Sequence, residues 1–232
     1  MKAYILAGGL GTRLYPYSLI LPKPLLSIGN DTVIERVLKW LVKGGITDVT
    51  ISISSKANLY RLLIGDEFMG ARLSYDIQPE PAGTASQLKR AAADQSSTFV
   101  AVYADSIIDC ELSEAIKVHR DKRALCTILA YRYTESSQYG ILEAQNGLLK
   151  KWIEKPNESS LIATGAFIFD PSFLRYVPEE GRFGMDQAVN RAVRMKERIA
   201  VFDRVKSFTD VGNRRSYLKA TRAAVEEMGH IP

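Results

Sequence analysis

Short apolar runs alternate with amphipathic stretches along the first half of the chain. The runs are rich in β-branched and aromatic residues, which favours buried strands, whereas the stretches between them repeat apolar residues with helical spacing. We expect strands at 3–6, 48–54, 71–77 and 98–105, and helices at 32–45, 58–65 and 84–94. A repeated strand–helix–strand order is typical of a doubly wound, mostly parallel, Rossmann-like α/β sheet.

Local signals sharpen two predictions. Thr32 and Glu35 have the spacing of a capping box, in which each side chain bonds the backbone N–H of the other residue. Gly44–Gly45 ends the same apolar pattern and predicts the end of the helix. Farther along, Asn146–Gly147 predicts a type I′ turn between two strands of a hairpin within 139–154.

The second half of the chain is less regular and predicts a smaller, mixed β lobe. Besides the hairpin, we expect strands at 124–133, 163–170 and 199–203, and helices at 186–197 and 215–228. No internal repeat, linker or charge block divides the sequence. We therefore expect a single domain at 1–232.

Composition excludes several classes of protein. With 46% hydrophobic and 25% charged residues, the 232-residue chain is globular rather than disordered. Its net charge of +5 suits an anionic small substrate as well as a nucleic acid. Two cysteines and two histidines are too few for a typical zinc site, so carboxylates would hold any metal, which points to magnesium. We expect a cytoplasmic protein with no membrane partner, because neither a membrane-length apolar run nor a signal peptide is recognisable.

A glycine-rich loop after the first strand is the strongest chemical signal. Gly8, Gly9 and Gly11 would let backbone amides approach a phosphate chain, and Arg13 and Lys23 would supply positive charge. The dinucleotide-binding fingerprint would need a third glycine at position 14, and the Walker phosphate loop would need Gly-Lys-Ser/Thr. A tight turn with solvated charges is the simpler alternative.

The same segment closely resembles the signature of the sugar-1-phosphate nucleotidylyltransferases, and the pattern Gln-Pro-x-Pro-x-Gly at 78–83 looks most like that of the glucose-1-phosphate thymidylyltransferases. Further motifs follow in the family's order: "QPEPAGTASQL", "VYAD", "YGILE", "WIEKP", "TGAFIFD" and "FTDVGN". The resemblance implies an enzyme that joins a nucleoside triphosphate to a sugar 1-phosphate, releases pyrophosphate and uses Mg²⁺. It also implies a nucleotide-binding lobe at 1–110 and a sugar-phosphate-binding lobe at 111–232.

The resemblance assigns roles to individual residues. The catalytic set it implies is Arg13 on the leaving pyrophosphate, Lys23 on the nucleotide phosphates and Asp105, which holds magnesium together with Asp210. The nucleotide-binding set is Leu6, Ala7, Gly8, Gly9, Gly11, Thr12, Arg13, Lys23, Gln78 and Gly83. The sugar-phosphate set is Gly140, Glu154, Lys155, Thr164 and Gly165. Simpler roles exist for the two aspartates: Asp105 as a turn former, and Asp210 as the N-cap of the last helix.

Gln78 is the candidate reader of the base. A uracil or thymine edge offers acceptor, donor and acceptor, which an amide can complement, so dTTP or UTP is favoured. The resemblance to the thymidylyltransferases implies glucose 1-phosphate as the sugar phosphate. One alternative is a member that uses GTP or CTP with mannose 1-phosphate or another phosphorylated alcohol. Another is a non-catalytic, nucleotide-binding regulatory homologue. We expect no nucleic-acid partner, and association into a homo-oligomer stays open.

Overall fold

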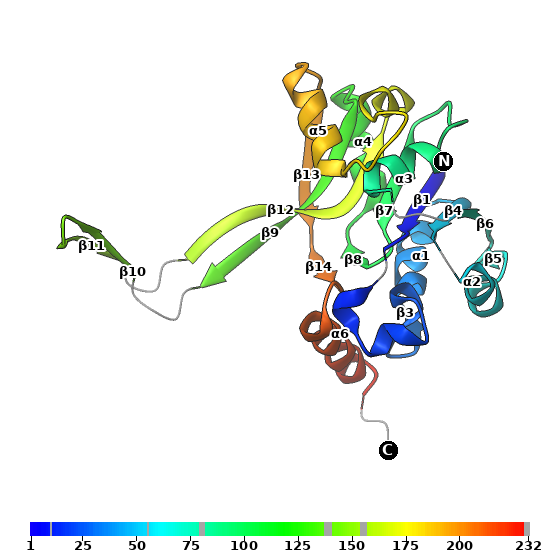
Figure 1. Ribbon diagram of the computed structural model, residues 1–232, viewed down its shortest axis with the longest axis horizontal. Helices are drawn as coiled ribbons and strands as arrows, with labels where there is room; N and C mark the ends of the chain where they lie inside the picture. Colours follow the sequence, from blue (N-terminus) through cyan, green and yellow to red (C-terminus); the bar gives the residue numbers. More distant parts are fainter. Residues whose placement is uncertain (10, 55, 79–81, 137–140, 154–156, 230–232) are drawn as a thin grey trace.

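The computed structural model describes residues 1–232 except 10, 55, 79–81, 137–140, 154–156 and 230–232 (Figure 1). Its centre is an eight-stranded sheet in the order β13 (Ile199–Val205), β9 (Cys126–Ser136), β12 (Asn157–Phe169), β7 (Phe99–Tyr103), β1 (Lys2–Ala7), β4 (Asp48–Ile53), β6 (Ala71–Ile77) and β5 (Glu67–Phe68). Four neighbouring pairs are parallel, whereas β12 and β5 pair antiparallel to their neighbours. The predicted mostly parallel α/β sheet is confirmed.

The other elements are short sheets and helices arranged around this centre. Three two-stranded antiparallel sheets pair β2 (Ser27–Ile28) with β3 (Asp31–Thr32), β8 (Ser106–Asp109) with β14 (Ser207–Asp210), and β10 (Ile141–Gln145) with β11 (Leu148–Ile153). The α-helices are α1 (Val33–Lys43), α2 (Ala57–Ile64), α3 (Thr84–Ala91), α4 (Leu112–Asp121), α5 (Met185–Arg194) and α6 (Arg214–Glu227). Short 3-10 helices are η1 (Thr12–Leu14), η2 (Tyr17–Leu19), η3 (Lys23–Leu25) and η4 (Pro171–Tyr176).

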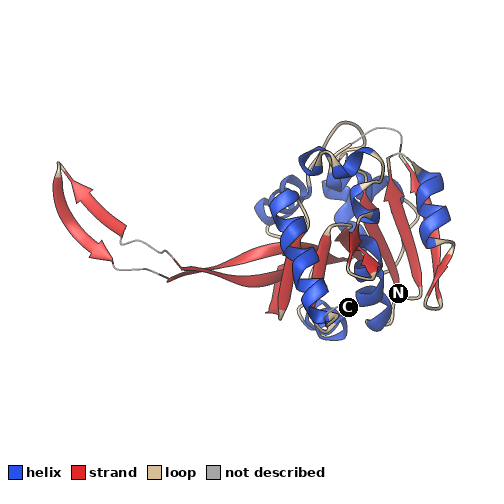
Figure 2. Ribbon diagram, turned by 90° about the horizontal axis from the view of Figure 1, so that it is seen from below, coloured by secondary structure: helices blue, strands red, loops and turns tan. Residues whose placement is uncertain are grey.

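Helices cover both faces of the central sheet, as Figure 2 shows. Along β1, Ala3, Ile5 and Ala7 join a core formed with α1, α2 and α4. Tyr4 and Leu6 point to the opposite face and join a second core formed with α3, α5 and η4. Side chains alternate between the faces of a strand, so a strand that is apolar throughout must be covered on both sides.

Two local predictions are confirmed in detail. At the start of α1, the Thr32 N–H donates to a Glu35 carboxylate oxygen at 2.6 Å, and the Glu35 N–H donates to the Thr32 hydroxyl at 3.3 Å. Between β10 and β11, Asn146 and Gly147 both have positive φ, at 52° and 76°, which a type I′ turn requires.

Strands β9 and β12 extend from the body of the molecule as a long two-stranded ribbon. Strands β9 and β12 pair antiparallel from Cys126 and Phe169 out to Ser136 and Asn157, and the β10–β11 hairpin lies beyond the end of that ribbon (Figures 1 and 2). The strand predicted at 163–170 is therefore much longer than expected. Among the described residues, no helix is long and apolar enough to cross a membrane.

Replacing Thr32 with alanine should lower the free energy of unfolding by about 1 kcal/mol, because the Glu35 N–H at the start of α1 loses the Thr32 hydroxyl as its hydrogen-bond acceptor. Urea denaturation measures the change. Thr32→Ser keeps the hydroxyl and is the matched control, expected within a few tenths of a kcal/mol of wild type. Equal losses in the two variants would contradict a capping role.

Candidate functional site

The glycine-rich loop opens a cavity at the C-terminal ends of β1 and β7. Gly11 takes the left-handed conformation, with φ at 66°, and lies immediately before η1. The cavity has a volume of about 410 Å³. Its lining is Leu6, Ala7, Gly9, Gly11, Thr12, Arg13, Lys23, Pro24, Thr84, Tyr103, Ala104, Asp105, Arg182 and Gly212. The loop and the strand ends thus lie at the edge where open α/β sheets generally bind ligands.

Lys23 and Asp105 form an ion pair inside this cavity. The Lys23 ammonium contacts Oδ2 of Asp105, and their side chains are 13% and 21% exposed. Asp105 lies two residues beyond the end of β7, and the intervening Ala104 N–H donates to the Leu6 carbonyl at 3.1 Å. Asp105 is therefore both a turn residue and part of the cavity wall. Arg13, in η1, lines the same cavity.

Asp210 is brought to the same place through backbone pairing. In the β8–β14 pair Asp210 lies opposite Ser106, and the Val211 N–H donates to the Asp105 carbonyl at 3.0 Å. Partial desolvation raises the pKa of Asp210, and the Asp105 carboxylate raises it further, whereas Lys23 and Arg13 lower it. The N-cap of α6 is Asn213, so Asp210 does not serve as that cap.

Two glutamines organise the neighbouring edge of the cavity. Gln78 is 5% exposed, and its Nε2 donates to Oδ2 of Asp76 at 2.5 Å and to the Gln87 carbonyl at 3.0 Å. Its Oε1 is buried and has no hydrogen-bond partner among the described residues. The Gln87 amide lies so close to Gly8 that a Cβ at Gly8 would stand 2.5 Å from Nε2. Gly8 therefore packs against Gln87, and Gly9, not Gly8, lines the cavity.

Gly83 lets the chain approach the segment that precedes α5. Its φ is 85°, and a Cβ there would lie 2.5 Å from the Phe183 carbonyl oxygen. The Ala85 N–H donates to that same oxygen at 3.1 Å, and the Thr84 hydroxyl accepts from the Met185 N–H at 2.9 Å. Close approach of two backbones thus joins the start of α3 to the start of α5.

A second cavity of about 300 Å³ adjoins the first, and Tyr103 lines both. Gly165, with φ at 79°, lines this second cavity within an irregular stretch of the β9–β12 pairing. Thr164 is not among the residues that line this cavity. Its hydroxyl donates to the Leu129 carbonyl at 2.8 Å, a hydrogen bond between β12 and β9. The predicted residues Gly140, Glu154 and Lys155 lie outside the described residues.

Sequence reasoning missed six residues of the cavity wall: Pro24, Thr84, Tyr103, Ala104, Arg182 and Gly212. Arg182 adds a guanidinium from the loop before α5. Its sequence signal was weak, because "EGRFG" reads as an ordinary glycine-flanked turn. Thr84 and Tyr103 looked like a helix start and a strand end, and those are their structural positions.

The chain belongs to the nucleotidyl transferase family, whose model matches residues 2–227. It is 29% identical over 230 residues to a mannose-1-phosphate guanyltransferase of Yarrowia lipolytica, covering 95% of this chain and 63% of that protein. It is 33% identical over 183 residues to mannose-1-phosphate guanyltransferase beta-B of Xenopus laevis, covering 75% of this chain and 51% of that protein. The chain thus spans about half to two thirds of the length of these curated relatives.

Solved structures share the fold. One is a Bacillus anthracis protein in complex with sucrose, provisionally assigned as a glucose-1-phosphate thymidylyltransferase, with a TM-score of 0.79, 23% identity and coverage of 97% and 95% of the two chains. Another is HddC from Yersinia pseudotuberculosis complexed with GMP-PN, with a TM-score of 0.74, 23% identity and coverage of 96% and 98%.

Gly165→Ala should lower the free energy of unfolding by about 1–3 kcal/mol. The variant meets two penalties: a left-handed φ, and a Cβ that would lie 2.5 Å from Cδ2 of Tyr103 and 2.8 Å from the Ser106 hydroxyl. Gly70→Ala is the matched control, because Gly70 has φ at 82° with no heavy atom within 4 Å of the added Cβ. Denaturant unfolding should show the larger loss of unfolding free energy for Gly165→Ala. Equal losses in the two variants would show that steric overlap of the added Cβ with Tyr103 and Ser106 does not contribute.

Proposed function

We propose that the protein is a sugar-1-phosphate nucleotidylyltransferase, which joins a nucleoside triphosphate to a hexose 1-phosphate and releases pyrophosphate. One observation carries the proposal: Arg13, Lys23 and Asp105 line one cavity beside the glycine-rich loop, and Asp210 is paired to its edge. Cations for phosphates and carboxylates for a hard metal ion are what transfer between two polyanions requires. The names of the relatives point to the same reaction.

The reaction needs no protein nucleophile. An anionic oxygen of the sugar 1-phosphate attacks the α-phosphorus, and the bond from that phosphorus to the oxygen bridging the β-phosphate breaks. The electron pair leaves with pyrophosphate. Arg13 and Lys23 neutralise the phosphates as charge shifts onto the leaving group, and the rigid strand ends hold both reactants in line. Tyr103 stands between the two cavities, so the larger would hold the triphosphate and the smaller the sugar.

The donor set suits magnesium. Among the described residues no group of three or more acidic, histidine or cysteine side chains could cage a metal, but Asp105 and Asp210 form a pair whose mutual repulsion contributes to the raised pKa of Asp210. Mg²⁺ is commonly held by one or two carboxylates together with waters and substrate phosphates. When bound, it would neutralise phosphate charge and relieve the repulsion between the two aspartates.

For the base we propose guanine, with mannose 1-phosphate as the first sugar to test. The carboxylate of Asp76 only accepts hydrogen bonds, so it holds the Nε2 of Gln78 and leaves Oε1 as an acceptor with no partner in the described part of the chain. Guanine presents two adjacent N–H donors on its Watson–Crick edge, whereas thymine or uracil presents one donor between two acceptors. The curated relatives named as guanyltransferases support this choice.

Thymidylyl transfer to glucose 1-phosphate is the second candidate. The pattern Gln-Pro-x-Pro-x-Gly at 78–83 favours it, because this spacing resembles that of the thymidylyltransferases. It would require the Gln78 amide to turn and present its NH₂ group to the base, at the cost of the bond to Asp76.

Asp105→Asn and Asp210→Asn should each lower kcat/KM by about 100-fold or more, because each removes a negative ligand from the proposed metal site. Pyrophosphate release at several Mg²⁺ concentrations measures the effect. Asp109→Asn, at the far end of the same β8–β14 pair, is the control and should retain wild-type rates. Wild-type turnover in either test variant would remove that aspartate from the site.

Asp76→Asn should shift the enzyme from guanine toward pyrimidine bases. An asparagine NH₂ at position 76 can donate to Gln78 Oε1, which frees the Gln78 NH₂ to donate to a base oxygen. The ratio of kcat/KM for GTP to that for dTTP should fall about 5- to 30-fold, equivalent to ~1–2 kcal/mol.

Asp48→Asn is the control for this experiment, because Asp48 pairs with Arg72 at the opposite end of β4 and β6. A wild-type enzyme that prefers dTTP, or an unchanged ratio in Asp76→Asn, would reject the proposed role of Asp76 and Gln78.

A further inference from the structure

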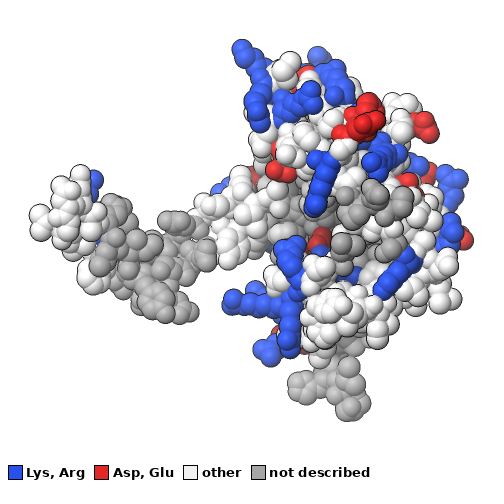
Figure 3. All heavy atoms as spheres, in the orientation of Figure 1, with Lys and Arg blue, Asp and Glu red and all other residues white. Residues whose placement is uncertain are grey.

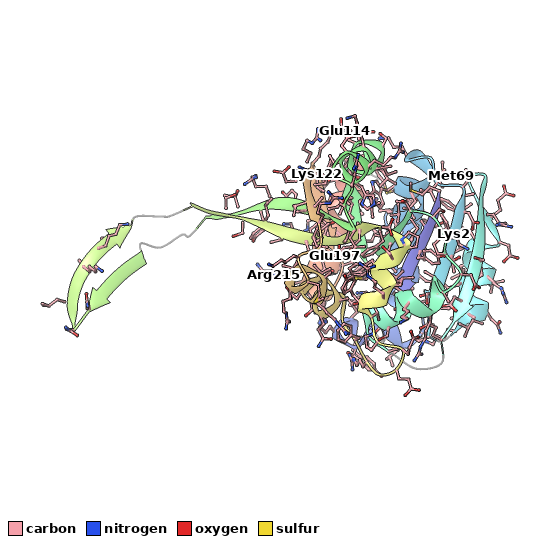
Figure 4. The ribbon with its side chains drawn as sticks, turned by 90° about the horizontal axis from the view of Figure 1, so that it is seen from above. Lys2, Met69, Glu114, Lys122, Glu197 and Arg215 are labelled. Atoms are coloured by element: carbon pink, nitrogen blue, oxygen red, sulfur yellow. The ribbon has the colours of Figure 1, made fainter. Side chains whose placement is uncertain are left out.

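A separate cavity of about 360 Å³ lies at the opposite end of the central sheet from the candidate active site. Thr98, which precedes β7, is part of its wall, whereas Tyr103 and Asp105 at the other end of β7 line the first cavity. Five residues of strand separate the two sites by about 17 Å. Figure 4, which looks onto this end of the sheet, labels Glu197 in the cavity wall.

Most of the charged residues that line this remote cavity are arginines. Arg120, Arg123, Arg175 and Arg198 line it together with only two carboxylates, those of Asp170 and Glu197, which leaves a net charge of +2. Figure 3 shows Lys and Arg side chains gathered at this upper end of the molecule. His119 also lines the cavity, and burial lowers its pKa, so it adds no charge near neutral pH. The cavity is therefore set up for an anion.

Three of the four arginines form no ion pair with another described residue. Arg175 is paired with Glu197 at 2.5 Å, and Asp170 accepts from the Ser172 N–H at 2.9 Å. The guanidinium groups of Arg120 and Arg123 have no ion-pair partner among the described residues, and neither has that of Arg198. Arg120, Arg123 and Arg198 can therefore offer N–H donors to a ligand.

The backbone also holds the cluster in place. Arg123 follows α4 with φ at 45°, a left-handed position that helix ends usually give to glycine. Its carbonyl accepts from Nε of Arg198 at 3.1 Å, which orients that guanidinium and leaves its four other N–H groups. An arginine at such a backbone position is strained, and it keeps a charged side chain where glycine would be easier.

The end of α4 explains only part of this arrangement. A helix C-terminus carries roughly half a negative charge, which favours nearby cations such as Arg120 and Arg123. Arg175 comes from η4 and Arg198 from the segment before β13, so neither belongs to that helix end. Arginines from three elements thus line one cavity, and guanidinium groups bind phosphate through paired N–H donors.

We propose that this cavity, formed by α4, η4 and the start of β13, binds the phosphate group of a small phosphorylated molecule. Its volume is at the lower end of small-molecule sites and leaves room for a sugar beside the phosphate. The proposal concerns binding at a site remote from the glycine-rich loop, and it does not rest on the proposed catalytic function.

Calorimetric titration of the full chain tests the proposal with three probes: inorganic phosphate, glucose 6-phosphate and glucose. The phosphate-bearing probes should bind saturably with Kd below about 1 mM, and glucose should not bind. Tighter binding of glucose 6-phosphate would identify a phosphate ester as the natural ligand class, whereas equal binding would identify inorganic phosphate.

Four variants assign the binding to a site. Arg123→Gln and Arg198→Gln should each weaken phosphate binding about 10-fold or more. Arg194→Gln, an exposed arginine at the end of α5, should leave it unchanged. Arg13→Gln removes a cation from the candidate active site, so phosphate binding that persists in this variant belongs to the remote cavity. Thermal melting of each variant checks that it is folded. No saturable binding, or binding lost in Arg13→Gln and kept in the two cavity variants, would overturn the proposal.

Discussion

The contact between Lys23 and Asp105 ties the two halves of the candidate site together. Lys23 begins η3, at the end of the long segment after β1, and Asp105 lies in the turn after β7. Neither charge could remain partly buried without a partner, so the loop must fold back over the strand ends. The same contact holds a cation where a polyanion would enter. The path of this segment thus depends on the Lys23–Asp105 pair together with its buried leucines Leu14 and Leu25.

Backbone pairing completes the site from a remote part of the chain. Asp210 follows Asp105 by about a hundred residues, yet the β8–β14 pair sets it beside Ser106. Two carboxylates so close repel each other, and the raised pKa of Asp210 records that repulsion together with desolvation. Lys23 and Arg13 partly offset it. The repulsion between the two carboxylates is thus only partly compensated by nearby cations, which suits a site that would bind a metal ion and phosphates.

Much of the architecture could be predicted from local patterns. The strand at β1 and the capped helix α1 follow from periodicity and capping, which depend on residues close in sequence. The pairing of β8 with β14 could not, since each strand has only four residues and its partner lies about a hundred residues away in the sequence. Arg182 was missed for the same reason: it enters the cavity wall through contacts made far along the chain. The orientation of the Gln78 amide depends on Asp76, a partner that the sequence alone does not reveal.

Tyr103 lines both cavities of the candidate site, and this shared wall limits how the protein could change its substrates. A substitution at Tyr103 would reshape both cavities at once, so one binding preference could not be tuned there without disturbing the other. Residues that touch a single cavity, such as Arg182 on one side and Asn190 on the other, have no such constraint. New specificities within this architecture should therefore arise first at the outer walls, with the aromatic ring between the cavities left in place.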